Sequence, residues 1–545
     1  MQFVAVFQLL WLYQTAAAVL YVDVNSANPT PPYTNWASAA TNIQDAVNLA
    51  STGDQILVTN GIYQYGGAFY SGSNRVYIAK AIIVQSVNGP AATIIEGEQG
   101  PPTVRCVCLV SGSMLQGFSL TNGCASSSGV YGGGVYCRAV GIGIPSAVVS
   151  NCIITGNRSY LIGGGAYMGL LKNCVLIGNV AGDSGSGGFT GGGASSSTLY
   201  DCSVISNAVI GAGSGMGGGL YSCTASNCLI ANNSSADLGG GACQGSLVNC
   251  RLFNNTAGIL NSSSSAGGGG AYATSLTDCL VVSNCVIGGI TVSGVGCGFG
   301  CSLFNCTVVD NSVLSAFGMA GGVYNGTVFN SIVYNNTASN YPNYYGGLHY
   351  SCTIPLPASG DNNFTNAPLF VDPAGGDFHL GPNSPCINSG NNDQVVGAYD
   401  LDGNPRIVGG TVDAGAYEYQ TPSSILSYAW AQEFNLPTGG SADYLDLDGT
   451  GMPNWQKCTA GLNPTNPASV LAMLPLTTTN IALGVTVTWQ SVNNRTYYLL
   501  RATNLAIQPA YLIIQSNLLG QTGTTSYLDR TATNGGPYFY RVRIQ

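Results

Sequence analysis

The chain has 545 residues, a formal net charge of -9 from 14 basic and 23 acidic residues, and 77 glycines. A single hydrophobic core rarely exceeds about 300 residues, so we expect internal repeats or several domains. Only 7% of the residues are charged, which excludes a highly charged disordered protein. The basic residues are scattered singly and form no phosphate-binding patch, so nucleic acid is excluded as an expected partner.

The first 18 residues, MQFVAVFQLLWLYQTAAA, form an apolar run that ends in small residues and predict a signal peptide cleaved near Ala16 to Ala18. No Lys or Arg precedes Arg75, so a buried N-terminal segment is the alternative. No later stretch approaches the roughly 18 uncharged apolar residues that a membrane span requires. We therefore expect an exported monomer with no transmembrane segment in the mature chain.

The segment NIQDAVNLA at 42–50 predicts a short helix with Ile43, Ala46, Val47 and Ala50 on one face. Asp45 lies in its first turn, where the helix dipole favours an acid. The segments LYVDV and DQILVTNGIYQ on either side are typical of strands. An open end of a stacked sheet must be covered, so we interpret this helix as an N-terminal cap.

A hexad that begins with Cys and ends with Asn then recurs at intervals of 22 to 29 residues. Its copies are Cys152 to Asn157, Cys174 to Asn179, Cys202 to Asn207, Cys228 to Asn233, Cys250 to Asn255, Cys279 to Asn284 and Cys306 to Asn311, and Ser331 to Asn336 continues the series. The residue two places after each Cys or Ser is always aliphatic, which predicts a strand with both side chains inside. The aligned Asn side chains can bond neighbouring repeats and the backbone of the turn.

A glycine run forms the second fixed element, and its last glycine usually lies nine residues before the Cys, as in Gly219 to Cys228. The stretch from Asn to the next glycine run instead varies from 8 residues, at Asn157 to Gly165, to 15, at Asn255 to Gly270. Short strands, constant sides and one variable loop predict stacked β rungs rather than helices, because each glycine costs about 1 kcal/mol in a helix.

The seven repeat cysteines share one inward position. Rungs lie about 4.8 Å apart, and the Cβ atoms of a disulfide are normally about 3.5 to 4.5 Å apart. We therefore interpret these cysteines as small buried hydrophobic residues and not as bridges.

Residues 20 to 100, with NIQDAV, GDQILVTNGIYQYGG and IIVQSVNGPAATIIEG, resemble the N-terminal part of bacterial right-handed parallel β-helix proteins of the pectin-lyase-like superfamily. Residues 362 to 419, with NAPLFVDPAGGDFHLGPNSPCINSG and DLDGNPRIVGGTVDAGAYEY, resemble the closing segment of polymorphic-outer-membrane-protein-like β-helices. The resemblance implies an all-β right-handed parallel β-helix over 19–419 and an extracellular or bacterial cell-surface location. It implies no single activity, because that superfamily contains lyases, hydrolases and adhesins.

From residue 420 the glycine runs stop. The linker at 420–475 carries Asp443, Asp446 and Asp448 and resembles a DxDxDG calcium loop. Thr450 replaces a further Asp and Lys457 replaces the bidentate Glu, so Ca²⁺ is a candidate cofactor only at a degenerate site. Residues 476–545 alternate apolar and polar side chains and resemble a small fibronectin-like β-sandwich.

Catalysis by this fold needs a base, or two or three clustered carboxylates. The candidates are Asp183 and Asp237 in variable loops, together with Arg158 and Arg251. Asp201 and Asp278 precede repeat cysteines where other rungs carry Asn, so we interpret both as turn residues. The two histidines, His349 and His379, form no known catalytic pattern.

The residue that follows the inward position of the glycine element is aromatic in most rungs. This tyrosine stripe comprises Tyr136, Tyr167, Tyr221, Tyr272, Phe299, Tyr324 and His349, and Ser195 and Cys243 interrupt it. If these rings face outward, sugar rings can stack on them; the alternative is that tyrosine simply suits an exposed strand. The sequence favours a non-catalytic polysaccharide-binding or adhesion protein, and a polysaccharide lyase or glycoside hydrolase is the alternative.

Overall fold

The computed structural model describes residues 17–126, 131–138, 146–182, 188–211, 214–258, 265–288, 291–293, 300–315, 318–476, 483–493 and 495–544. The expected signal peptide at 1–18 lies almost entirely outside the described residues. The chain divides into two compact units. Unit 1 comprises Met1–Ser302, Val308–Gly326 and Asn335–Tyr345; unit 2 comprises Leu303–Thr307, Thr327–Tyr334 and Gly346–Gln545.

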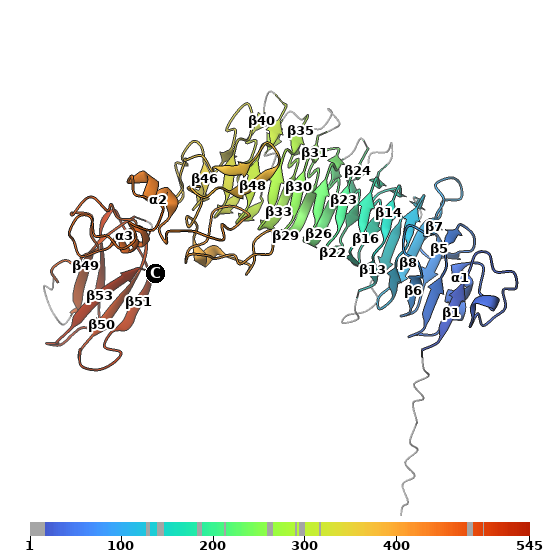
Figure 1. The fold of residues 1–545 in the computed structure, drawn as a ribbon, viewed down its shortest axis with the longest axis horizontal. Helices are drawn as coiled ribbons and strands as arrows, with labels where there is room; N and C mark the ends of the chain where they lie inside the picture. Colours follow the sequence, from blue (N-terminus) through green and yellow to red (C-terminus); the bar gives the residue numbers. More distant parts are fainter. Residues whose placement is uncertain are drawn as a thin grey trace, which may run out of the picture. The chain divides into compact units, whose positions relative to one another are not determined.

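Three parallel sheets build most of unit 1 (Figure 1); sheets 1 and 2 begin in the first rungs, and sheet 3 begins at β11. Sheet 1 contains β1 (Val19–Val22), β2 (Gln55–Val58), β5 (Ser73–Ile78), β6 (Ile83–Ser86), β8 (Arg105–Val110), β9 (Met114–Gln116), β12 (Val135–Arg138), β13 (Val148–Ser150), β16 (Ala166–Tyr167), β17 (Leu170–Lys172), β21 (Ala194–Ser195), β22 (Thr198–Tyr200), β26 (Leu220–Ser226), β29 (Ala242–Val248) and β33 (Ala271–Thr277). Sheet 2 contains β3 (Gly61–Tyr63), β7 (Thr93–Glu96), β10 (Ser119–Thr121), β14 (Ile153–Thr155), β18 (Val175–Ile177), β23 (Ser203–Ile205), β27 (Leu229–Ala231), β30 (Arg251–Phe253), β34 (Leu280–Val282) and β38 (Thr307–Val309). Sheet 3 contains β11 (Cys124–Ala125), β15 (Arg158–Ser159), β19 (Val180–Ala181), β24 (Ala208–Val209), β28 (Ser234–Ser235), β31 (Thr256–Ala257), β35 (Cys285–Val286) and β39 (Ser312–Val313).

The hexads form the strands of sheet 2, as predicted. In β14 the flanking Cys152 and the central Ile154 are buried, and β14 pairs in parallel register with β18. The residue before each repeat Cys adopts positive φ, including Asp201 at 54° and Asp278 at 50°. Asn and Asp tolerate this left-handed conformation better than most residues, so both aspartates act as turn residues, as predicted.

A ladder of buried Asn side chains joins successive rungs at the turn between sheets 2 and 3. In one step, Oδ1 of Asn255 accepts from the backbone N–H of Asn233 at 3.0 Å and from its Nδ2 at 2.9 Å. Nδ2 of Asn255 donates to the carbonyl of Ile230 at 2.8 Å. The same pattern recurs at Asn157, Asn179, Asn207, Asn284 and Asn311. Each side chain therefore satisfies buried backbone groups of its neighbours.

The last glycine of each glycine run packs directly on this ladder. A Cβ atom at Gly241 would lie 2.5 Å from the carbonyl oxygen of Gly270 and 3.0 Å from Cγ of Asn255. One at Gly219 would lie 2.6 Å from the carbonyl oxygen of Gly241 and 3.0 Å from Cγ of Asn233. Close backbone approach explains why glycine recurs at these positions.

The repeat cysteines are buried and none is recorded in a disulfide, in line with the prediction. Neighbouring rungs touch through them: the backbone N–H of Cys174 donates to Sγ of Cys202 at 3.4 Å, and the N–H of Cys202 donates to Sγ of Cys228 at the same distance. Thiol sulfur atoms accept such bonds only weakly.

The predicted cap forms as α1 (Ile43–Leu49), with Ile43, Ala46, Val47 and Ala50 buried. Oδ1 of Asn42 accepts the backbone N–H of Asp45 at 3.0 Å and so caps the N-terminus. At the other end, Nζ of Lys80 donates to the carbonyl of Ala50 at 2.5 Å. A cation there also suits the negative end of the helix dipole.

Unit 2 begins with parallel strands and ends with antiparallel ones. Its elements are β42 (Thr327–Phe329), β43 (Ile332–Tyr334), β45 (Leu348–His349), β46 (Cys352–Thr353), β47 (Phe370–Asp372), β48 (Asp377–Leu380), η2 (Asn392–Gln394), α2 (Tyr428–Glu433), α3 (Asn454–Ala460), β49 (Val485–Ser491), β50 (Thr496–Ala502), β51 (Leu512–Leu519), β52 (Gly523–Asp529) and β53 (Phe539–Ile544). Strands β49 and β52 form a two-stranded sheet, and β51, β50 and β53 form a three-stranded sheet. Both sheets contribute to a buried cluster that includes Val487 and Leu499. The fibronectin-like assignment and the domain boundaries stay predictions. Among the helices of the described residues, none is long and apolar enough to cross a membrane.

The Asn ladder predicts a large stability difference between two adjacent residues. Replacing Asn255 with Ala removes the acceptor of two donors on Asn233, and we expect a loss of about 2 to 4 kcal/mol in the free energy of unfolding. The neighbouring Asn254 is exposed with φ 52°. Asn254→Gly is the matched control and should change stability by less than about 0.5 kcal/mol. Chemical denaturation measures both, and equal losses would contradict the ladder's role.

Candidate functional site

The tyrosine stripe lies on the outer face of sheet 1. Inward Val135 and Cys137 of β12 are buried, whereas Tyr136 between them is partly exposed. The strand register aligns the stripe in the order Tyr136, Tyr167, Ser195, Tyr221, Cys243 and Tyr272, and separately aligns Tyr324 in β41 (Val323–Tyr324) with Tyr345 in β44 (Tyr344–Tyr345). The stripe therefore exists, interrupted at Ser195 and Cys243 as the sequence indicates.

One member of the stripe differs from the prediction, and one is not described. The residue in register with Tyr324 is Tyr345, whereas His349 pairs with Phe329 one column away and stacks on it with ring centroids 4.7 Å apart. Counting residues from the glycine run places His349 in the column of Tyr324, which is wrong because the last repeat is shorter than the earlier ones. Phe299 lies outside the described residues.

The rings of the stripe fall into two groups. Tyr131 stacks on Tyr167 at 4.7 Å, and Tyr136 packs against Tyr167 at 5.8 Å, so these rings cover each other's faces. Tyr221 and Tyr272 instead flank the short side chain of Cys243 and contact no other ring in the described part of the chain. Partial burial raises the pKa of Tyr272. Among the described residues, Tyr221 and Tyr272 are thus the stripe tyrosines that stack on no other ring, apart from any contact with Phe299, which is not described.

Two arginines organise the N-terminal end of the stripe, a role the sequence did not indicate. Arg105 is buried, and its Nε donates to the carbonyl of Gly132 at 2.7 Å while its guanidinium lies 5.4 Å from the ring centroid of Tyr136. Arg138 lies 4.8 Å from the ring centroid of Tyr70. The sequence could not predict the pairs Arg105–Tyr136 and Arg138–Tyr70, because the two residues of each pair lie in different rungs.

Three of the four ionisable candidates for catalysis lie within the described residues, each on a different strand or loop. Asp183 lies outside the described residues. Oδ2 of Asp237 accepts the backbone N–H of Gly215 at 2.8 Å, which fixes a loop. Arg158 lies in sheet 3 and donates to the carbonyl of Gly182 at 3.1 Å, whereas Arg251 lies in sheet 2. Asp237 and Arg158 thus bind backbone groups of their own unit.

The acidic loop of the linker does not fit calcium. Nζ of Lys457 contacts Oδ2 of Asp448, and both side chains are buried. Asp443 accepts bonds from Ser424 and Ile425 instead. Desolvation raises the pKa of Asp448, but hydrogen bonds from Lys457 and Thr450 outweigh it and hold that pKa below its ordinary value.

Within the described ranges, no group of three or more His, Cys, Asp or Glu side chains could hold a metal ion. The candidate calcium site at Asp443, Asp446 and Asp448 therefore does not fit the metal, because Lys457 neutralises Asp448.

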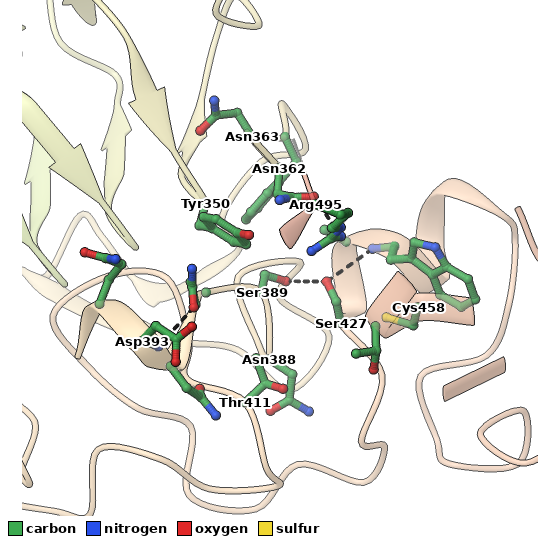
Figure 2. A pocket seen from close by; sticks show the side chains of 18 of the residues that line it. Tyr350, Asn362, Asn363, Asn388, Ser389, Asp393, Thr411, Ser427, Cys458 and Arg495 are labelled. Atoms are coloured by element: carbon green, nitrogen blue, oxygen red, sulfur yellow. Dashed lines mark hydrogen bonds between the residues drawn. The ribbon is translucent and has the colours of Figure 1, made fainter. Parts of the chain in front are cut away.

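Unit 2 contains a pocket of about 1360 Å³ that the sequence did not reveal (Figure 2). Its polar lining is largely bonded to itself. Oγ of Ser389 and Oγ of Ser427 lie 2.8 Å apart, and Nη2 of Arg495 donates to Oδ1 of Asn362 at 3.0 Å. Asp393 and Glu433 are among the residues that line the same pocket.

Ionisable groups also hold the closing segment together. Asp413 accepts the backbone N–H groups of Asn388 and Tyr419 at 2.7 and 2.6 Å, and Glu418 accepts that of Val408 at 2.9 Å. Desolvation by burial raises the pKa of Asp413 to about 7 and that of Glu418 to about 8.

His379 lies in the same segment, between two carboxylates. Its ring nitrogens lie 2.6 Å from Asp377 and 2.6 Å from Asp402. Partial burial lowers the pKa of His379, but the bonds to Asp402 and Asp377 outweigh that effect and raise it above 6.5. These contacts agree with the structural role that the sequence assigns to the closing segment.

No protein-family model and no curated protein matches the sequence. Several solved structures are similar to it. Pectate lyase Pel9A is 15% identical, with 74% of this chain and 97% of that chain covered and a TM-score of 0.41. A tailspike protein, gp49 from Acinetobacter baumannii bacteriophage Fri1, a capsular polysaccharide depolymerase, is 10% identical, with 97% and 86% covered and a TM-score of 0.30. The catalytic unit of a GH87 α-1,3-glucanase from Streptomyces thermodiastaticus is 12% identical, with 65% and 68% covered and a TM-score of 0.25.

The chain is a parallel β-helix. Its own strand register carries this assignment, and it agrees with the fold that the pectin-lyase-like resemblance implies. At identities of 10% to 15%, the activities of these proteins do not transfer to this β-helix.

The Lys457 contact predicts a linker that is insensitive to calcium. Adding CaCl₂ or EDTA should leave the thermal unfolding midpoint unchanged, because an ammonium group already neutralises Asp448. Lys457→Met should lower the midpoint by several degrees, because it leaves a buried carboxylate without its partner. Differential scanning calorimetry measures both effects, and a clear rise in midpoint with calcium would contradict the assignment.

The raised pKa values predict that unit 2 loses stability as the pH rises. Asp413 and Glu418 titrate near 4 when unfolded but near 7 and 8 when folded, so the folded state binds more protons in between. The contribution is fully present below about pH 4 and is lost as the pH passes 7 to 8; His379 acts in the same direction. Thermal unfolding at pH 5, 6, 7 and 8 should show a falling midpoint, with a smaller slope in Glu418→Gln. A midpoint that rises over this range would contradict the prediction.

Proposed function

We propose that this β-helix is an extracellular or cell-surface protein that binds a polysaccharide along its tyrosine stripe and catalyses no reaction on it. The observation that carries the proposal is the pair of rings at Tyr221 and Tyr272, which are partly exposed, lie two rungs apart and stack on no other ring among the described residues. An aromatic face offers a sugar ring apolar contact at little conformational cost. An extended stripe suits a chain-like ligand, since successive rungs present similar groups at a fixed spacing of about 4.8 Å.

The ionisable groups also favour binding over catalysis. A lyase or hydrolase needs a base or paired carboxylates near the reacting bond. Beside Tyr221 and Tyr272, the strands β26, β29 and β33 carry no Asp, Glu, His, Lys or Arg. Asp237 and Arg158 bind backbone groups instead.

A polysaccharide lyase or glycoside hydrolase is the second candidate. One observation favours it: Asp393 and Glu433 line the same pocket of unit 2, and two carboxylates in one cleft are what a hydrolase requires. If this alternative holds, the protein should release reducing ends or unsaturated products from a polysaccharide, and Asp393→Asn and Glu433→Gln should abolish that release.

Retention on insoluble polysaccharides tests the proposed function. Tyr221→Ala and Tyr272→Ala should each weaken binding about fivefold, from the loss of about 1 kcal/mol of ring contact, and the double variant should weaken it further. Tyr160→Ala is the control, because Tyr160 is an exposed tyrosine that follows β15 in sheet 3, away from the stripe. Tyr167→Ala should mainly lower stability, since its ring faces are covered by other rings.

Two results would contradict the proposal. The double variant could be retained as well as wild type, or the wild-type protein could release reducing ends or unsaturated products from the polysaccharide that it binds.

A further inference from the structure

Three neighbouring strands of sheet 1 form the most regular outer surface of unit 1. β26, β29 and β33 each have seven residues, and they pair in parallel register from Leu220 to Ser226 (Figure 1). In earlier rungs the same path is broken into two shorter strands, such as β16 and β17. Ser222, Gln244 and Ala273 have φ values of 49°, 59° and 49°, so all three strands bend at one register. We call the outer face of these strands the three-strand platform.

The platform contains only uncharged groups. The polar side chains that face outward beside the two tyrosines include Ser222, Thr224, Ser226, Gln244, Ser246 and Ser275. Val248, in register with Ser226, adds an apolar one. Thr224, Ser246 and Ser275 lie in one row, because the register pairs them directly. Oγ of Ser222 donates to Oε1 of Gln244 at 3.1 Å. Asp278 follows β33 at the turn, outside the strands.

Several of the cations elsewhere in unit 1 donate to backbone carbonyls. Arg75 donates to the carbonyl of Glu96 at 2.8 Å, Lys80 to that of Ala50 and Arg105 to that of Gly132. Arg138 lies over the Tyr70 ring. Lys172 is exposed at the end of β17, two rungs before β26. None of these positive charges lies on the three-strand platform.

We infer that the ligand of the three-strand platform is an uncharged polysaccharide, a proposal that rests on the proposed function and specifies its substrate class. A polyanion needs several cations along its path to offset the desolvation of its carboxylates, and the platform offers none. The net charge of -9 also repels a polyanion at long range.

Sugar hydroxyls match the groups that the platform does offer. Each hydroxyl of Ser or Thr both donates and accepts a hydrogen bond, as does each hydroxyl of a sugar, and the amide of Gln244 does the same with separate atoms. The row of Thr224, Ser246 and Ser275 repeats this chemistry from rung to rung. Tyr221 and Tyr272 add ring faces beside the row. The platform thus combines apolar contact with exchangeable hydrogen bonds and carries no charge.

The test compares retention of the full chain on neutral polymers (cellulose, xylan and β-1,3-glucan) with retention on polygalacturonate and alginate, at 50 mM and 500 mM NaCl. We expect at least one neutral polymer to retain the protein equally at both salt concentrations, and both polyanions to retain it at least tenfold less. Tyr272→Ala should reduce that neutral retention about fivefold, whereas Tyr160→Ala should leave it unchanged.

The possible failures are distinguishable. Retention on a polyanion that falls steeply with salt would overturn the uncharged ligand class while leaving polysaccharide binding intact. Retention on a neutral polymer that is equal in Tyr272→Ala and wild type would overturn the platform as its site. Retention on none of the five polymers would overturn the proposed function itself.

Discussion

The requirement that buried backbone groups find partners at every turn determines how this β-helix is built. Between sheets 2 and 3 the chain turns inside the core, and the Asn ladder supplies the missing acceptors and donors, as where Asn255 serves Asn233 and Ile230. The ladder in turn allows only glycine at Gly219 and Gly241, whose Cα atoms lie against its amides. These two constraints fix the length of two sides of each rung, and the third side is left to vary in length.

The fixed sides explain why the outer surface of sheet 1 can act as a binding surface. Once the register of the core is set, every outward residue of β26, β29 and β33 lies in a row with its counterparts. Tyr221 and Tyr272 therefore occur at a spacing imposed by the backbone, with Cys243 between them. A linear polymer would meet a ring at every second rung and a hydroxyl of the row Thr224, Ser246 and Ser275 at each rung, so modest contacts add along its length.

Much of this architecture follows from sequence because repetition makes each position visible several times. The inward Cys and aliphatic positions, the Asn turn and the α1 cap could all be predicted from spacing. The parts that could not be predicted are contacts between unrelated rungs or segments: Arg105 with Gly132, Lys457 with Asp448, and the pocket walls in unit 2. His349 was assigned to the wrong column because the final repeat departs from the common length, and period counting fails where the period changes.

Chemical footprinting of tyrosines tests the account most directly. The protein would be nitrated with and without a saturating neutral oligosaccharide, and each tyrosine would be quantified by peptide mass spectrometry. The account predicts that the ligand protects Tyr221 and Tyr272 and leaves Tyr160 as reactive as before. Protection at Tyr350 in the pocket of unit 2, with none at Tyr221 or Tyr272, would contradict it.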